Sequence, residues 1–301
     1  MSFSSEAKAE ICRNAISKKC CAVSECYGVL LFCNSFSGSG IRIITANPDF
    51  AARLVPLFRR AFGLGFDVLP AAGSSGKKSF IINDPKKLEK IFNTYGYTFG
   101  ATLSHHVNLS VMEDDCCKVS FIRGAFLAGG SVTDPEKRYH LELTTSHYSV
   151  SRETLAILSD MGFSAKEASR SGNRLIYFKQ ADTIADFFTA LGASSAALSI
   201  MTAKVDKEMR NEITRKVNCD TANADKVVAT ARAQIDTIHE IVGKYGLDSL
   251  PEPLKDAALL RIANPEASLA DLSVLSYPKV SKSTLAYRLK RLENFRPDPE
   301  E

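Results

Sequence analysis

Apolar residues between 113 and 145 follow two different spacings. Over residues 119–129 they recur at helical spacing, and the acidic run Glu113-Asp114-Asp115 precedes them, where negative charge favours the start of a helix. In the following segment, GSVTDPEKRYHLELTT (130–145), polar and apolar residues alternate around an Asp-Pro-Glu-Lys turn. The pattern therefore predicts a helix followed by a hairpin whose second strand covers residues 139–145.

The same region continues with a second helix and a second hairpin. Ser151 is placed to cap a helix that runs to Met161. Short strands are expected near 165–169 and at 174–179, on either side of a Ser-Gly-Asn turn. A last helix over 183–191 ends at a glycine. Residues 113–192 therefore have the order helix, hairpin, helix, hairpin, helix.

This pattern occurs twice. The segment Cys20-Cys21-Ala22-Val23-Ser24 matches Cys116-Cys117-Lys118-Val119-Ser120 at an offset of 96 residues. The same offset relates four further pairs of landmarks, which are Gly28 and Gly124, residues 34–36 and 130–132, Gly76 and Gly172, and Gly96 and Gly192. A period this long exceeds that of a solenoid unit. It favours two copies of one αβ half-domain facing each other across a pseudo-two-fold axis, with first-copy helices at 48–62 and 85–95.

The last hundred residues have a different pattern. Residues 201–224 are polar and dense in charge, with little apolar periodicity, which indicates a linker with some helix. Residues 225–245 predict an amphipathic helix whose apolar face comprises Val227, Val228, Ala231, Ile235, Ile238 and Val242. Three shorter helices are expected after it. The first covers 254–263, and the second begins after Ser268, which is placed to form a capping box with Asp271. The third runs from a Ser281 cap to about 294.

The last two helices, joined by a short turn, have the layout of a helix-turn-helix. Val280, Leu285, Leu289 and Leu292 would bury one side of the final helix and leave a basic, hydroxyl-rich side outward. Ser and Thr can contact bases or phosphates, and Arg288 could bind guanine bidentately. The candidate DNA-binding residues are Lys279, Ser281, Lys282, Ser283, Thr284, Tyr287, Arg288, Lys290 and Arg291, with Arg296 as a further phosphate contact. The alternative is a solvated basic helix in a small bundle.

Basic residues of the linker form a second candidate set. Lys204, Lys207, Arg210, Arg215 and Lys216 could hold phosphates, or the segment could be a flexible tether.

Composition and the remaining motifs narrow the class of protein. The chain of 301 residues is 45% hydrophobic and 24% charged, with a net charge of +4, as in an ordinary globular protein of about two domains. The N-terminus has no apolar run of signal-peptide length, so we expect a cytoplasmic protein. The eight cysteines contain no Cys-x-x-Cys pair, and we interpret them as small buried hydrophobes, with no metal site. No nucleotide-binding loop or nucleophile elbow is present, so we expect no cofactor or small-molecule substrate. The longest apolar stretch near the N-terminus, Val29 to Cys33, is too short to span a bilayer, so we expect no membrane partner.

Histidines offer weaker candidates. His140 and Glu142 share a strand face, where they could touch DNA or pair with a neighbouring strand. His105-His106 has no acids at metal-ligand spacing, and an exposed loop or helix turn is expected there.

The segment Phe126-Leu127-Ala128-Gly129 ends the first helix of the second copy, and here the sequence resembles the LAGLIDADG homing endonucleases. The resemblance implies two helices packed through small residues, each delivering one carboxylate to a metal site, beside two curved sheets that form a saddle over DNA. We interpret the small residues Ala128 and Gly129 as contact points between these helices. Aligning Leu127-Ala128-Gly129 with the start of the motif places Asp134 at the acid. The 96-residue offset places Gly38 opposite it, so one acid is missing, and Asp134 before a proline also suits a structural turn.

The whole chain resembles the WhiA family. The resemblance rests on RGAFLAGGSVTDPEKRYHLEL (123–143), RNEITRKVNCDTAN (210–223), LPEPLKDAALLRIANPEASLADL (250–272) and VSKSTLAYRL (280–289). It implies a DNA-binding regulator of Gram-positive bacteria, tied to sporulation, cell division or chromosome segregation, whose endonuclease-like domain has lost cleavage.

We therefore predict an α+β fold with a duplicated αββαββα endonuclease-like domain at 1–200 (repeats about 17–100 and 113–200). A linker at 201–224 and an all-α domain at 225–301 follow, with the helix-turn-helix at about 267–300. The function expected is non-enzymatic, sequence-specific binding of double-stranded DNA at the nucleoid, with a sigma factor or another protein as a further partner. Two alternatives stay open: a Mg²⁺-dependent endonuclease that uses Asp134, and a protein adaptor or non-specific DNA-binding protein in cell division.

Overall fold

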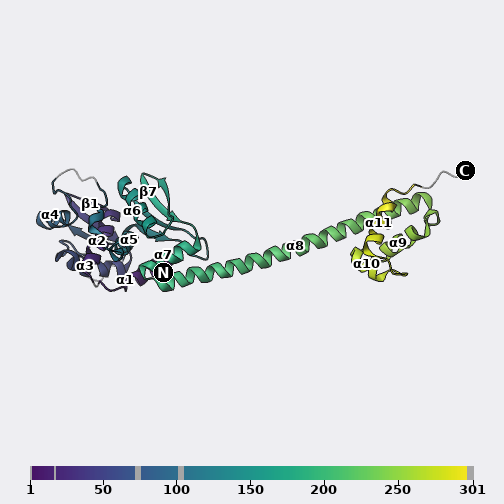
Figure 1. Cartoon of the computed structure of the whole chain (residues 1–301), viewed down its shortest axis with the longest axis horizontal. Helices are drawn as coiled ribbons and strands as arrows, with labels where there is room; N and C mark the ends of the chain where they lie inside the picture. The colour runs from purple at the N-terminus through teal and green to yellow at the C-terminus, as the bar shows by residue number, and fades with distance from the viewer. Residues whose placement is uncertain (1, 17, 72–75, 101–104, 297–301) are drawn as a thin grey trace. The chain divides into compact units, whose positions relative to one another are not determined.

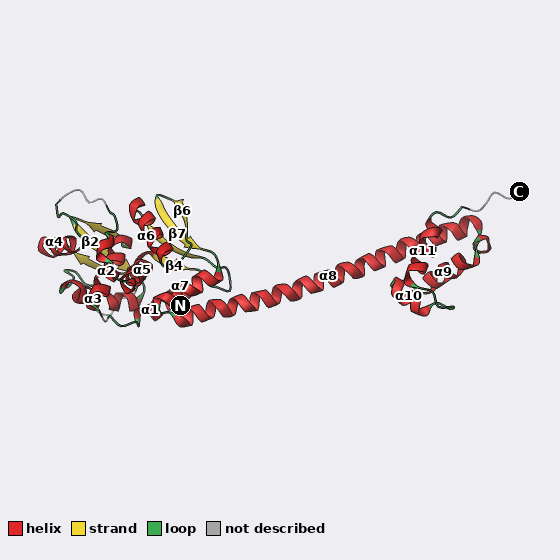
Figure 2. Ribbon diagram, viewed as in Figure 1, coloured by secondary structure: helices red, strands yellow, loops and turns green. Residues whose placement is uncertain are grey.

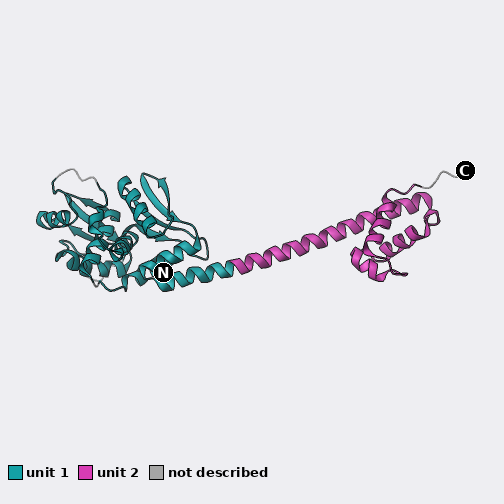
Figure 3. Cartoon of the chain, viewed as in Figure 1, with its two compact units in different colours: residues 1–207 teal, residues 208–301 magenta. Residues whose placement is uncertain are grey.

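A computed structural model of the chain describes residues 2–16, 18–71, 76–100 and 105–296 (Figure 1). The chain forms two compact units, residues 1–207 and 208–301 (Figure 3). Residues 297–301, at the expected end of the helix-turn-helix region, lie outside the described residues. Among the helices that are described, none has the length and apolarity that crossing a bilayer requires.

Unit 1 is an α+β fold built from two related halves (Figure 2). The first half consists of α1 (Phe3–Cys12), α2 (Lys19–Phe32), β1 (Ser35–Ser37), β2 (Gly40–Thr45), α3 (Pro48–Phe62), β3 (Lys78–Ile82), α4 (Pro85–Thr94) and the 3-10 turn η1 (Leu109–Val111). The second half consists of α5 (Asp115–Gly129), β4 (Gly130–Val132), β5 (Leu141–Thr145), α6 (Tyr148–Asp160), β6 (Lys166–Arg170), β7 (Asn173–Phe178) and α7 (Ala181–Leu191). The duplication that the 96-residue offset indicated is therefore present in the fold.

The two antiparallel sheets have matching registers. Their strand orders are β1-β2-β3 and β4-β5-β7-β6. Ile41 pairs with Ile82 in the first sheet as Leu141 pairs with Phe178 in the second. The first sheet has an isolated bridge from Val68 to Ile81 where the second has its fourth strand.

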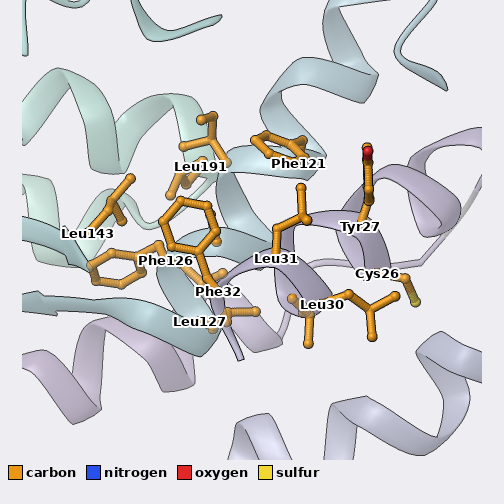
Figure 4. Close-up of a cluster of buried hydrophobic side chains, with 14 of the residues drawn as sticks. Cys26, Tyr27, Leu30, Leu31, Phe32, Phe121, Phe126, Leu127, Leu143 and Leu191 are labelled. Atoms are coloured by element: carbon orange, nitrogen blue, oxygen red, sulfur yellow. The ribbon is translucent and has the colours of Figure 1, made fainter. Parts of the chain in front are cut away.

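Helices α2 and α5 lie in the centre of the unit 1 core. Most residues of both helices are buried, as expected for helices surrounded by other elements. Figure 4 shows side chains of the two helices packed together, among them Leu31 and Phe32 from α2 and Phe121 and Phe126 from α5, all of which are buried.

The first turn of α6 differs from the sequence prediction. The helix begins at Tyr148 rather than after Ser151, which lies buried within it. The Ser151 hydroxyl donates to Glu167 Oε1 at 3.0 Å. The chain instead turns at Thr145, whose hydroxyl accepts a hydrogen bond from the His147 amide at 3.3 Å. Ser151 therefore joins α6 to β6 and does not cap the helix.

A single helix, α8 (Ser194–Tyr245), covers the segment where we expected a linker and a separate helix from 225. No glycine or proline occurs between Gly192 and Gly243, and Ala, Met, Lys, Glu and Arg, which favour helix, are frequent in residues 201–224. Their lack of apolar periodicity reflects exposure, since almost all of residues 208–230 are exposed. The prediction that residues 201–224 are only partly helical is therefore wrong.

Unit 2 contains the rest of α8, η2 (Leu247–Ser249), α9 (Glu252–Ala263), α10 (Leu269–Leu275) and α11 (Lys282–Glu293). Its core comprises Ile238, Ile241, Leu250, Leu254, Ala257, Ala258, Leu272, Leu285, Leu289 and Leu292. The buried face of α8 here differs from the predicted one, because Val228 is exposed whereas Gln234 and Ile241 are buried. The Ser268–Asp271 capping box and the Ser281 cap both form as predicted.

Candidate nucleic-acid interface

Serine hydroxyls fix the turn between α10 and α11. Ser273 Oγ donates to the carbonyl of Val280 at 2.7 Å, and Ser276 Oγ donates to the carbonyl of Ser273 at 2.8 Å. Ser276 Oγ also accepts a hydrogen bond from the Val280 amide at 2.9 Å. These bonds set the direction in which α11 starts relative to α10.

A buried arginine holds the approach to α10. Arg261, in α9, is 2% exposed, and its Nη1 donates to the carbonyl of Ala267 at 2.6 Å. Burial lowers the pKa of this guanidinium from its ordinary value. Because Ala267 precedes the Ser268 cap, Arg261 ties the loop before α10 to α9.

Helix α11 has one apolar and one polar side. Leu285, Leu289 and Leu292 are buried against α9 and α10. Its opposite side and the residues before it are exposed, comprising Lys279, Ser281, Lys282, Ser283, Thr284, Tyr287, Lys290, Arg291 and Arg296. The positive end of the helix dipole lies at Lys282, which makes this end of α11 favourable for anions such as phosphate.

The hydroxyls at the start of α11 form a local network. Ser281 Oγ caps the helix by accepting from the Thr284 amide at 3.1 Å. It is also within 2.9 Å of Ser283 Oγ and 2.8 Å of Thr284 Oγ1. Ser281 therefore caps the helix as the sequence predicts, and Ser283 and Thr284 are exposed beside it.

Arg288 does not lie fully outward, in contrast to the prediction. Its side chain is half-buried and lines a cavity of about 320 Å³ between α9, the turn and α11. Glu252 and Asp256 of α9 line the same cavity, as does Tyr277, which is 98% exposed. Arg288 lies three residues after the buried Leu285 and therefore borders the buried face of α11. The aliphatic part of its side chain covers the edge of the core.

The basic residues of α8 divide into two groups. Lys204 Nζ pairs with Asp182 Oδ1 at 2.7 Å, and Lys207 Nζ donates to the carbonyl of Pro135 at 2.6 Å, so both contact the second half of unit 1. Arg210, Arg215 and Lys216 are exposed.

The glycines that bring α2 and α5 together are Gly28 and Gly124. A Cβ on Gly28 would lie 2.0 Å from the carbonyl oxygen of Phe121, and a Cβ on Gly124 would lie 2.0 Å from that of Glu25. We had assigned the close contact to Ala128 and Gly129. Gly129 does meet Phe32, but the helix backbones approach at the earlier glycines, which the 96-residue offset already paired.

This contact changes the alignment with the LAGLIDADG motif. If Gly124 is the motif's first glycine, the acid five positions later falls at Gly129, and the repeat offset gives Cys33 in the other half. Neither residue carries a carboxylate. A Cβ on Gly129 would lie 2.6 Å from the carbonyl oxygen of Thr144, so no acid fits there without displacement of the backbone. The residues at the ends of these two helices therefore do not fit the endonuclease metal site.

Asp134 lies in the turn between β4 and β5. Its Oδ1 accepts a hydrogen bond from the Glu136 amide at 3.0 Å, and its carbonyl accepts one from the Lys137 amide at 3.0 Å. The loop between the first two strands, counted from the last hydrogen-bonded pair, contains six residues, 134–139, in the second half, but only Gly38 and Ser39 in the first half. Asp134 therefore belongs to an insertion between the strands, as the turn interpretation proposed.

His140 and Glu142 contact each other and a neighbouring strand. His140 Nε2 is 3.1 Å from Glu142 Oε2, and the Ser131 hydroxyl of the adjacent strand β4 donates to Glu142 Oε1 at 3.3 Å. These contacts favour strand pairing over the alternative of DNA contact.

His105 is half-buried rather than in an exposed loop. Its Nε2 lies 2.7 Å from the carbonyl oxygen of Phe36, and its ring stacks on that of His147 at 3.7 Å between centroids. Burial lowers the pKa of both histidines, that of His147 to about 4, with the charge of His105 as a second cause. No spacing along the chain indicated this pair, which joins β1 of the first half to the start of α6 in the second.

Comparisons with known proteins agree with both units. Residues 118–210 match the model of the WhiA LAGLIDADG-like domain, and residues 213–296 match that of the WhiA C-terminal HTH domain. The chain is 36% identical to the "Probable cell division protein WhiA" of Ruminiclostridium cellulolyticum, over 98% of this chain and 97% of that protein. It is 34% identical to the protein of that name from Clostridium novyi, with the same coverage.

A solved structure shows the same fold. Full-length DUF199/WhiA from Thermatoga maritima superposes with a TM-score of 0.59 at 24% identity, over 98% of this chain and 97% of that one. Its coverage includes both the endonuclease-like unit and the helical unit. From the domain matches and the full-length similarity, the chain belongs to the WhiA family.

Proposed function

We propose that this protein is a sequence-specific DNA-binding transcriptional regulator acting in cell division, chromosome segregation or sporulation. The observation that carries the proposal is the exposed basic and hydroxyl-bearing surface at the start of α11, in a unit that matches a helix-turn-helix family model. Its relatives are named as cell division proteins, which supports the cellular role. Such a regulator would work in the cytoplasm, at the nucleoid.

In this proposal, α11 enters the major groove. Ser283 and Thr284 lie in its first turn, where a recognition helix reaches base edges, and Lys282 lies at the positive end of the helix dipole, where it would meet a phosphate. Tyr287 and Arg291 follow one and two turns along the same exposed side, with Arg291 lying over the Tyr287 ring at 5.9 Å. Arg288 would read a guanine by swinging from the cavity edge towards the groove.

Unit 1 in this proposal does not cleave DNA. Cleavage of a phosphodiester with Mg²⁺ needs carboxylates that hold the ion and orient water. The alignment on Gly124 supports the proposal, because it puts Gly129 and Cys33 where those carboxylates would be. The unit would orient the DNA-binding unit, add electrostatic contact or bind a protein partner such as a sigma factor. The proposed phosphate contacts along α8 are the exposed residues Arg210, Arg215 and Lys216. Lys204 and Lys207 are already engaged by Asp182 and by the carbonyl of Pro135.

Variants of α11 test the assignment on a DNA sequence selected by the protein. Arg288→Ala should lower affinity for that sequence by about 1–3 kcal/mol and relax the preference at one base. Lys282→Ala should weaken binding to selected and random DNA alike, and reduce the slope of log K against log salt by about 1. Lys244→Ala, which removes the same charge from an exposed site at the end of α8, is the control.

Wild-type affinity in both Arg288→Ala and Lys282→Ala would contradict the placement of α11 in the DNA. Equal affinity of the wild-type protein for all sequences would instead favour a non-specific DNA-binding protein or an adaptor.

A further inference from the structure

Four cysteines meet at the N-terminal ends of the two central helices. Cys20 and Cys21 lie in the first turn of α2, and Cys116 and Cys117 in that of α5, at positions related by the repeat. Because Gly28 and Gly124 allow the helices to approach closely, the two pairs come together. The Sγ atoms of Cys21 and Cys116 are 3.4 Å apart.

The remaining distances make this a compact cluster. The Sγ atoms of Cys20, Cys21 and Cys117 all lie within 4.8 Å of one another, and so do those of Cys116 and Cys117 with an Asp114 carboxylate oxygen. In a tetrahedral zinc site with Zn–S bonds of about 2.3 Å, neighbouring sulfur atoms are about 3.8 Å apart. The 3.4 Å between the Cys21 and Cys116 sulfur atoms is already close to that spacing.

We propose that Cys20, Cys21, Cys116 and Cys117 form a tetrathiolate site for Zn²⁺ that joins the two halves of unit 1. Two ligands come from each half, so the ion would bind on the pseudo-two-fold axis and hold the starts of α2 and α5 together. Asp114, 4.0 Å from the Cys116 sulfur, lies beside the site. The site is at the opposite end of these helices from Gly129 and Cys33, so it is separate from the position of the endonuclease acids.

The electrostatics of the two helix ends suit such a site. Four thiolates around Zn²⁺ carry a net charge of −2, and the positive ends of two helix dipoles point at them. Neither first turn is capped by a side chain, since Lys18 and Asp114 make no side-chain cap hydrogen bond. The side chains of these two cap residues therefore do not compete for the amides of the first turns.

Three of the four cysteines are not fully buried. We expected small buried hydrophobes, but Cys20 is exposed and Cys21 and Cys116 are half-buried, and only Cys117 of the four is buried. An ion can reach the cluster from solvent through Cys20. Cys-x-x-Cys spacing is not required at such a site, because the ligands would come from two helices.

The proposal is tested with Co²⁺, which reports both its geometry and its ligands by absorption. The full-length, untagged protein is stripped of metal under a non-thiol reductant and titrated with CoCl2. We expect one Co²⁺ per chain, the visible bands of a tetrahedral ion and the near-ultraviolet charge-transfer band of thiolates. Zn²⁺ should then displace Co²⁺ at one equivalent and raise the melting temperature.

Variants identify the ligands. Cys20→Ser changes an exposed side chain and leaves the core intact, and it should lower Zn²⁺ affinity at least tenfold. The double variant Cys21→Ser with Cys116→Ser should abolish the charge-transfer band. Cys219→Ser, at an exposed cysteine of α8, should bind Co²⁺ as the wild type does. Absence of binding, the weak spectrum of a six-coordinate ion, or unchanged binding in Cys20→Ser would each overturn the site.

Discussion

Gly28 of α2 and Gly124 of α5 lie at equivalent positions of the repeat, and each leaves room for a backbone carbonyl of the other helix. An added Cβ would approach that oxygen to 2.0 Å in both cases. We therefore expect Gly28→Ala and Gly124→Ala to force the helices apart. Each should lower the free energy of unfolding by about 3 kcal/mol or more, as for overpacked cores.

Urea denaturation measures this effect, with Gly65→Ala as the control. A Cβ on Gly65 would meet no atom within 4 Å, and its φ is not in the left-handed region. Equal stability of Gly28→Ala and Gly65→Ala would mean that the helices are further apart than the 2.0 Å contact of an added Cβ implies.

A buried ion pair supports the same helix from the other side. Glu25 of α2 is bound in bidentate fashion by Arg53 of α3, at 2.6 and 2.9 Å, and Arg123 lies 3.6 Å away. Arg53→Met would leave the buried carboxylate with only the more distant guanidinium. We expect a loss of about 3–5 kcal/mol in unfolding free energy.

The double variant Glu25→Met with Arg53→Met should recover part of that loss, because no uncompensated carboxylate remains. A double-mutant cycle in urea gives the coupling. Strict additivity of the two single substitutions would show that the pair does not interact as the distances indicate.

The His105–His147 stack predicts an acid-sensitive contact between the halves of unit 1. The pKa of His147 is lowered to about 4 in the folded protein, against about 6.5 when unfolded. Because the unfolded chain binds the proton more readily, this contribution to stability is complete above pH 6.5 and is lost as pH falls towards 4. His147→Phe keeps an aromatic ring at this position and removes the titration of His147.

Unfolding midpoints at pH 7 and pH 5 check this prediction. The wild type should lose more stability between the two values than His147→Phe does. A loss of the same size in both proteins would assign the acid sensitivity to other groups.

The sequence predicted the duplicated fold because each half repeats its landmarks, and it predicted α11 because Ser281 caps a run of leucines at helical spacing. The centre of unit 1 was harder to predict. The motif letters Leu127-Ala128-Gly129 suggested one alignment, whereas the backbone contact at Gly124 supports another, five residues earlier. A single glycine cannot show which partner backbone it faces.

Side-chain environments in the candidate interface were predicted less well than the helices that carry them. Helical spacing placed Arg288 outward, but it could not show that α9 contributes a cavity wall beside it. The continuity of α8 was missed because apolar periodicity signals burial, and an exposed helix lacks that signal. The cysteine cluster was not predicted because its members come from two helices 96 positions apart.

Selection of genomic DNA fragments by the purified protein tests the proposed function most directly. Binding would be done with Mg²⁺ present at about 0.15 M salt, and both the bound sequences and their ends would be determined. We predict enrichment of a common sequence motif in fragments with intact ends. New internal ends at that motif would show an active endonuclease, and no enrichment of any sequence would contradict specific binding by α11.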